Sequence, residues 1–102
     1  MGLTGNNYLI KLRQSIENSL AERYKTVFIV DGARCLEYGN VFFKISNLTW
    51  KDTQEDVILA EYADSKELAK KNLFADDGKM FYTNEMSEED IVKAIIEEVE
   101  ES

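Results

Sequence analysis

The sequence predicts an α+β domain with a mostly antiparallel sheet of about five strands and three helices, in the order α-β-β-β-β-α-β-α. Two observations carry this prediction. Apolar residues recur at helical spacing near both ends of the chain, whereas residues 24–50 alternate in hydrophobicity around two glycine turns. Amphipathic helices bury their apolar stripes on a sheet, so we expect a two-layer arrangement with residues 1–102 forming one domain.

The first helix is expected over about residues 6–22, with Asn6 or Asn7 as its N-cap. Its apolar stripe has helical spacing and consists of Leu9, Leu12, Ile16 and Leu20.

Residues 24–50 have the pattern of a β-meander, because Asp31-Gly32 and Gly39-Asn40 both favour two-residue hairpin turns. If both loops contain two residues, counting outward from them gives the strand register. The predicted opposite pairs are Val30–Ala33, Phe28–Cys35, Val27–Leu36, Tyr38–Val41, Leu36–Phe43 and Cys35–Lys44.

Side chains alternate across a strand, so this register divides the meander into two faces. One is a predicted core face with a single charged residue, and it contains Val27, Ile29, Arg34, Leu36, Tyr38, Val41, Phe43 and Ile45. The other, called the mixed face below, contains Phe28, Val30, Ala33, Cys35 and Phe42 together with Thr26, Glu37, Lys44 and Ser46. A third strand continuing to residue 50 would add Leu48 and Trp50 to the mixed face.

A fourth strand is expected over residues 56–63, followed by a short helix that Asp64 or Ser65 caps and that ends near Leu73. The residues of this helix expected to face inward are Leu68, Ala69 and Leu73. A turn at Asp76-Asp77-Gly78 then leads into a strand over residues 79–83.

The last helix begins after Ser87, which forms a capping-box pattern with Asp90. Its single apolar face consists of Ile91, Val92, Ile95, Ile96 and Val99.

Composition argues against several classes of function. The chain has no histidine, which removes the commonest general base, the Ser-His-Asp and Cys-His arrangements and most zinc sites. Cys35 is the only cysteine, so no internal disulfide can form. Because we find no apolar stretch typical of a signal peptide or membrane span, we expect a cytoplasmic protein.

The net charge of −8 is unevenly distributed. Residues 1–51 contain seven Lys/Arg and four Asp/Glu, a balance of +3, whereas residues 52–102 contain five and sixteen, a balance of −11. Nucleic acids and anionic membranes bind clustered Lys and Arg, so neither is an expected partner. A basic protein is compatible with this charge, and so is a purely solubilising role.

Three chemical interpretations fail. An EF-hand with Gly78 at its sixth position would begin at Leu73 and end at Asn84, which supply no carboxylate where the loop needs one. Cys35 lacks a histidine base, although a neighbouring Lys44 would lower the pKa of its thiol. No glycine-rich phosphate loop is present. We therefore predict no catalytic residue, cofactor or metal ligand.

Two surfaces are candidates for binding a partner. Four acids lie at the C-terminal end of the last helix, where the helix dipole disfavours them: Glu97, Glu98, Glu100 and Glu101. The second candidate is the mixed face, whose aromatic residues and neighbouring charges resemble a binding hot spot: Phe28, Phe42, Trp50, Glu37 and Lys44. The competing interpretation is that the first helix covers this face and makes it ordinary core.

We therefore predict a non-enzymatic protein-binding module. Its more specific form is a small acidic inhibitor of a basic protein, analogous in charge and size to toxin-neutralising immunity proteins. The alternative is a structural or regulatory homodimer formed through the mixed face. A third class is a small-ligand-binding protein, or an enzyme that uses carboxylates, Tyr and Lys.

Overall fold

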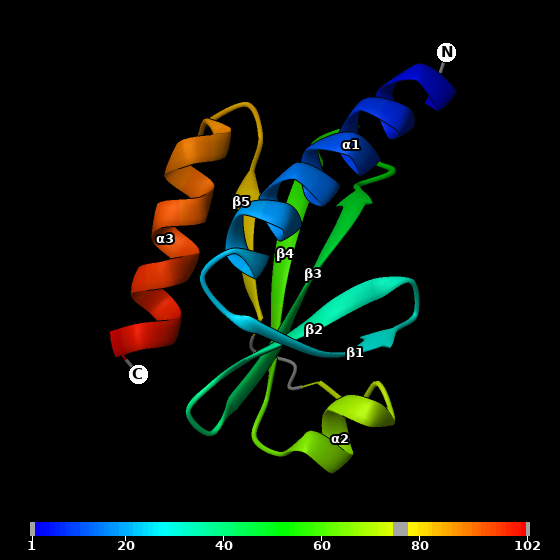
Figure 1. Cartoon of the computed structure of the whole chain (residues 1–102). Helices are drawn as coiled ribbons and strands as arrows, with labels where there is room; N and C mark the ends of the chain where they lie inside the picture. Colours follow the sequence, from blue (N-terminus) through cyan, green and yellow to red (C-terminus); the bar gives the residue numbers. More distant parts are fainter. Residues whose placement is uncertain (1, 75–77, 102) are drawn as a thin grey trace.

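A computed structural model describes residues 2–74 and 78–101 of the chain. It confirms the predicted α+β class and element order (Figure 1). The elements are α1 (Gly2–Ala21), β1 (Lys25–Val30), β2 (Ala33–Tyr38), β3 (Val41–Thr49), β4 (Asp56–Ala63), α2 (Lys66–Lys70), β5 (Lys79–Tyr82) and α3 (Glu88–Glu101).

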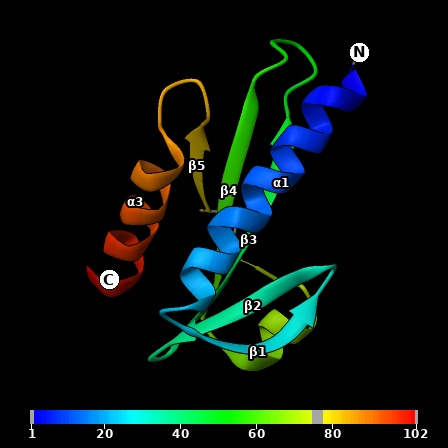
Figure 2. The ribbon, with the colours of Figure 1, turned by 45° about the horizontal axis from the view of Figure 1, so that its top comes forward.

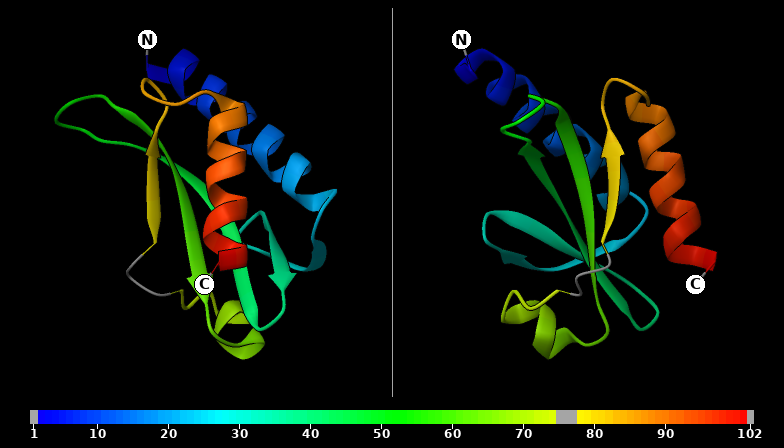
Figure 3. Two further views of the ribbon diagram at one scale, coloured as in Figure 1. Left: turned by 90° about the vertical axis from the view of Figure 1, so that its left-hand side faces the viewer. Right: turned by 180° about the vertical axis from the view of Figure 1, so that it is seen from behind.

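The five strands form one sheet in the order β1-β2-β3-β4-β5, and each is antiparallel to its neighbour. Helix α1 crosses one face of the sheet over β3, and α3 lies beside it near β5 (Figure 2). We name this the front face. The short helix α2 lies on the back face, where it covers only the end near the β1–β2 hairpin (Figure 3). Because the strand order is β1-β2-β3-β4-β5, the edge strands of the sheet are β1 and β5.

Both hairpin turns contain two residues, as predicted. Asp31 and Gly32 have positive φ angles of 51° and 79°, and Gly39 has a φ of 58°. The structure confirms the pairs Val30–Ala33, Phe28–Cys35, Leu36–Phe43 and Tyr38–Val41.

The predicted Val27–Leu36 pair is wrong, because a bulge lies between Thr26 and Phe28 and Leu36 pairs with Thr26 instead. The β2–β3 ladder runs from Leu36–Phe43 to Tyr38–Val41 and does not extend to the predicted Cys35–Lys44 pair.

The main core lies between the front face and the helices α1 and α3. Its buried residues are Leu9, Ile16, Leu20, Tyr24, Leu36, Phe43, Ile45, Ile58, Ala60, Phe81, Ile91, Ile95 and Val99. Three predicted core residues lie outside it. The bulge turns Val27 toward the back of the sheet, where it packs against the smaller cluster. Ile29 is 63% exposed, because α1 packs over β3 rather than β1. Tyr38 is 42% exposed.

A second, smaller core lies under α2 on the back face. Its buried residues are Val30, Cys35, Phe42, Ala63 and Ala69, and Val27, Phe28 and Phe74 pack against it. The expectation of an open mixed face is therefore wrong at this end of the sheet. The covering helix is α2, whereas the competing interpretation named the first helix.

Helix α2 is shorter than predicted. It ends at Lys70, and Asn72 has a left-handed φ of 59°, which turns the chain away from the helical path. The prediction that Leu68 and Leu73 face inward is wrong, because they are 41% and 56% exposed. Only Ala69 of this helix is buried.

The remaining boundaries agree with the sequence to within a few residues. Helix α1 begins at Gly2, so Asn6 and Asn7 lie within it and are not its caps. Ser65 and Ser87 do cap α2 and α3, since the hydroxyl of each accepts a hydrogen bond of 3.2 Å from a backbone N–H of the first turn.

Strand β3 ends at Thr49, one residue before the predicted end, and β5 likewise stops at Tyr82. The predicted turn residues Asp76 and Asp77 lie outside the described residues. No helix in the described part of the chain is long and apolar enough to cross a membrane.

Candidate protein-binding groove

The aromatic residues predicted for a partner surface do not form one patch. Phe42 is only 8% exposed and Phe28 is half-buried, because both pack under α2. The Nζ atom of Lys70 lies 6.0 Å from the centre of the Phe28 ring. Glu37 is half-buried on β2, whereas Trp50 lies beyond the end of β3 with 41% of its surface exposed.

Lys44 is a buried residue rather than a rim charge. It is 5% exposed, and its Nζ atom lies 3.6 Å from Oε1 of Glu61 and 5.2 Å from the centre of the Phe74 ring. The Ser46 hydroxyl donates a 2.7 Å hydrogen bond to the same carboxylate oxygen. This pair belongs to the interior of the back face, so Lys44 is not available to a partner.

Cys35 is fully buried in the smaller core. Burial raises the pKa of its thiol to about 11, although the charge of Lys44 lowers it. The predicted effect of Lys44 is present, but the loss of solvation outweighs it. Cys35 is therefore a small apolar packing residue.

We expect Cys35 to resist iodoacetamide in the folded protein at neutral pH. Its raised pKa alone should slow alkylation roughly 100-fold relative to the unfolded chain, and burial should slow it further. Mass spectrometry of the alkylated protein, in buffer and in guanidinium chloride, measures both rates. Since Cys35 is the only cysteine, rapid labelling in buffer would contradict the tight packing of α2.

Glu100 is bound by Arg23 and Tyr24, unlike the other three acids of the C-terminal cluster. Arg23 places Nη2 2.8 Å from its Oε2 atom, and the Tyr24 hydroxyl donates a 2.7 Å hydrogen bond to the same atom. The hydrogen bonds from Tyr24 and Arg23 lower the pKa of Glu100. Glu100 therefore joins the end of α3 to the segment between α1 and β1 and has a structural role.

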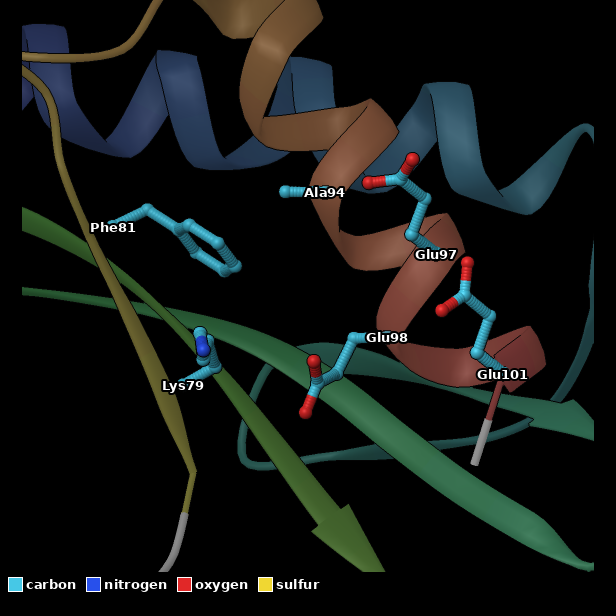
Figure 4. Close-up of a pocket in the computed structure, with 6 residues that line it drawn as sticks. All are labelled: Lys79, Phe81, Ala94, Glu97, Glu98 and Glu101. Carbon is cyan, nitrogen blue, oxygen red and sulfur yellow. The ribbon is translucent and has the colours of Figure 1, made fainter.

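The other three acids line a groove between α3 and β5. Its volume is about 420 Å³, and its walls are formed by Lys79, Phe81, Ala94, Glu97, Glu98 and Glu101. The Phe81 ring points from β5 toward α3, and Glu98 projects from α3 toward the strand (Figure 4). Within residues 2–74 and 78–101, none of the three carboxylates has a cationic side chain within 4 Å.

Helical periodicity explains this arrangement. Ala94, Glu97, Glu98 and Glu101 are spaced i, i+3, i+4 and i+7, so they form one stripe along α3. This stripe lies beside the apolar stripe of Ile91, Ile95 and Val99 that α3 buries in the main core. Packing of the apolar stripe therefore turns the acidic stripe toward β5.

Tyr62 carries a buried hydroxyl that has no hydrogen-bond partner among the described residues. Burial raises the pKa of this phenol, and the negative charge of Glu98 raises it further. The tyrosine therefore stays neutral at physiological pH.

The groove offers a surface suited to binding cationic groups. Its acids are exposed, and its walls carry no nucleophile of the Ser, Cys or Thr type. Among the described residues, no three His, Cys, Asp or Glu side chains are grouped as a metal site. The chemistry it does offer is charge complementarity to lysine or arginine side chains beside a small apolar floor.

Sequence reasoning did not identify Lys79, Phe81 or Ala94 as part of a site. The position of β5 could have been predicted, because the last strand of a meander commonly lies at the edge of its sheet. The α3 stripe at i, i+3, i+4 and i+7 was a second such signal.

Comparisons with protein-family models, with curated proteins and with solved structures found no match to this chain. The functional conclusion therefore depends on the geometry of the groove.

Proposed function

We propose that this protein is a non-enzymatic protein-binding module, in the manner of a small acidic inhibitor, and that it binds a basic partner protein in the groove between α3 and β5. One observation carries the proposal. Glu97, Glu98 and Glu101 line a single groove without a cationic partner among the described residues.

The charge distribution supports a steered encounter. Residues 52–102 carry a balance of −11, and the groove acids belong to this half of the chain. Clustered charge of one sign raises the association rate of an oppositely charged partner, and salt screens the effect. After the encounter, lysine or arginine side chains would pair with the groove acids, and Phe81 would contribute apolar contact.

The test uses a library of random dodecapeptides displayed on phage and selected on the purified protein. We expect the enriched peptides to be rich in Lys and Arg. Their association rates, measured by surface plasmon resonance, should fall about tenfold in the triple variant E97Q/E98Q/E101Q at low salt.

The matched control is E22Q/E67Q/E85Q, which removes the same charge from exposed acids outside the groove. Its association rates should stay within about twofold of the unmodified protein, because these acids lie outside the groove and Coulomb attraction weakens with distance from the bound peptide. Enrichment of acidic or neutral peptides, or an equal loss in both variants, would refute a basic partner in the groove.

The uncovered part of the back face favours one alternative, a homodimer. Among residues 2–74 and 78–101, no helix other than α2 covers the back of β3, β4 and β5 (Figure 3). Met80 is 44% exposed there, and Leu48, Leu59 and Tyr82 are half-buried. Light scattering coupled to size-exclusion chromatography distinguishes the two roles, since a dimer that persists at high salt indicates an apolar self-interface.

A further inference from the structure

β5 is an edge strand whose outer side has unpaired backbone groups. The N–H of Thr83 donates a 3.1 Å hydrogen bond to the carbonyl oxygen of Asp56, directly opposite it in the β4–β5 register. Hydrogen-bonded and non-hydrogen-bonded pairs alternate along an antiparallel ladder. The backbone groups of Phe81 and Lys79 therefore point toward β4, and those of Tyr82 and Met80 point outward.

Two contacts agree with this alternation. The carbonyl oxygen of Tyr82 accepts hydrogen bonds from the N–H groups of Glu85 and Met86, as an outward carbonyl can. Among the described residues, no hydrogen bond joins the backbone of Met80 to another element. The N–H and C=O of Met80 and the N–H of Tyr82 are thus available to an additional strand.

The two sides of this edge differ chemically. On the front, Lys79 and Phe81 lie beside the acidic stripe of α3, which supplies Glu97, Glu98 and Glu101 (Figure 4). On the back, the exposed Met80 lies directly opposite the half-buried Leu59, with Tyr82 next along the strand. A strand added here would present alternate side chains to an acidic surface and to an apolar one.

We propose that the outer edge of β5 binds an extended peptide segment by strand addition, and that the segment alternates basic and apolar residues. This inference rests on the proposed function and adds the binding mode and the sequence pattern of the partner. Main-chain hydrogen bonds to Met80 and Tyr82 supply affinity, and the two unlike surfaces supply specificity.

Charge selects this occupant over a second copy of the chain. Pairing two β5 edges would bring the groove acids of both copies close together, and like charges at close range oppose association. A basic segment neutralises the same acids. The uncovered back face has no such charge barrier, so a homodimer through that face is compatible with an occupied edge.

The experiment compares two hexapeptides of identical composition and charge, both acetylated and amidated: Lys-Val-Lys-Val-Lys-Val and Lys-Lys-Lys-Val-Val-Val. Fluorescence anisotropy measures the Kd of each for the full chain. We expect the alternating peptide to bind at least about tenfold more tightly than the block isomer. Methylation of alternate backbone nitrogens in the alternating peptide should abolish this advantage in one of the two methylation registers.

Hydrogen exchange measured by NMR supplies a second result that needs no protein variant. The Met80 and Tyr82 amides should exchange rapidly in the free protein and become protected at least about tenfold by the alternating peptide. The Phe81 amide is bonded to β4, so its protection should change little.

The outcomes separate the two proposals. Equal affinity of the two isomers, with both weakened in E97Q/E98Q/E101Q, overturns strand addition and leaves the acidic groove as a site for basic partners. Binding of neither peptide at millimolar concentration overturns both proposals. Protection of the Met80 amide in the free protein together with a dimer in light scattering also overturns the inference, because a second copy then occupies the edge.

Discussion

Replacing Phe43 by Ala should lower the free energy of unfolding by about 3–5 kcal/mol. Phe43 is fully buried at the centre of the main core. Its ring meets Tyr24 edge to face at a centroid distance of 5.4 Å and lies 6.3 Å from Tyr62. The substitution removes a large apolar side chain and leaves a cavity that the strands on either side of β3 cannot close.

Urea denaturation followed by circular dichroism measures this loss. The matched control is Ile29→Ala, which removes apolar atoms from a side chain that is 63% exposed and should cost less than about 0.5 kcal/mol. The comparison tests the packing of the sheet, because the sequence pattern places Phe43 and Ile29 on the same core face, whereas only Phe43 is buried in the structure. Similar losses in the two variants would contradict the described front face.

Glu61→Met should destabilise the protein by about 2–3 kcal/mol, because it leaves the Lys44 ammonium buried without its counter-charge. Lys44→Met should cost less than about 1 kcal/mol, since the Glu61 side chain is 26% exposed and also accepts the hydrogen bond from Ser46. The asymmetry follows from burial, since the Lys44 side chain is only 7% exposed.

The double variant K44M/E61M completes a thermodynamic cycle. Two apolar side chains can replace a buried ion pair at little cost, so the double variant should unfold within about 1 kcal/mol of the unmodified protein. Its free energy of unfolding is measured by the same urea titration. Additive losses would show that the two charges do not interact, so that the carboxylate of Glu61 would no longer account for the burial of Lys44.

Local sequence patterns determined most of the secondary structure. The two glycine turns required positive φ angles, and counting from them gave four correct strand pairs. The serines before α2 and α3 marked both helix starts. These features depend on residues close together in the chain, where side-chain sterics and capping act without help from the rest of the fold.

The candidate site was only partly predictable. The acids of the last helix were identified as a group, but the group divides in the structure. Glu100 pairs with Arg23 and Tyr24, whereas its neighbours line the groove. Helical spacing places Glu100 outside the stripe of Glu97, Glu98 and Glu101. Its cationic partner, Arg23, lies 77 positions earlier in the chain. No local pattern reveals such a partner.

The antiparallel sheet, the three helices, the turn geometry and the acidic second half were all predictable from the amino-acid sequence. Tertiary packing decided which faces and edges remain accessible. The bulge at Val27 turned its side chain from the predicted front face to the back face. Helix α2 covered Phe28 and Phe42, and the strand order left β5 at an edge beside α3. Exposure depends on contacts between distant segments, and periodicity indicates only that a face is apolar, not which element covers it.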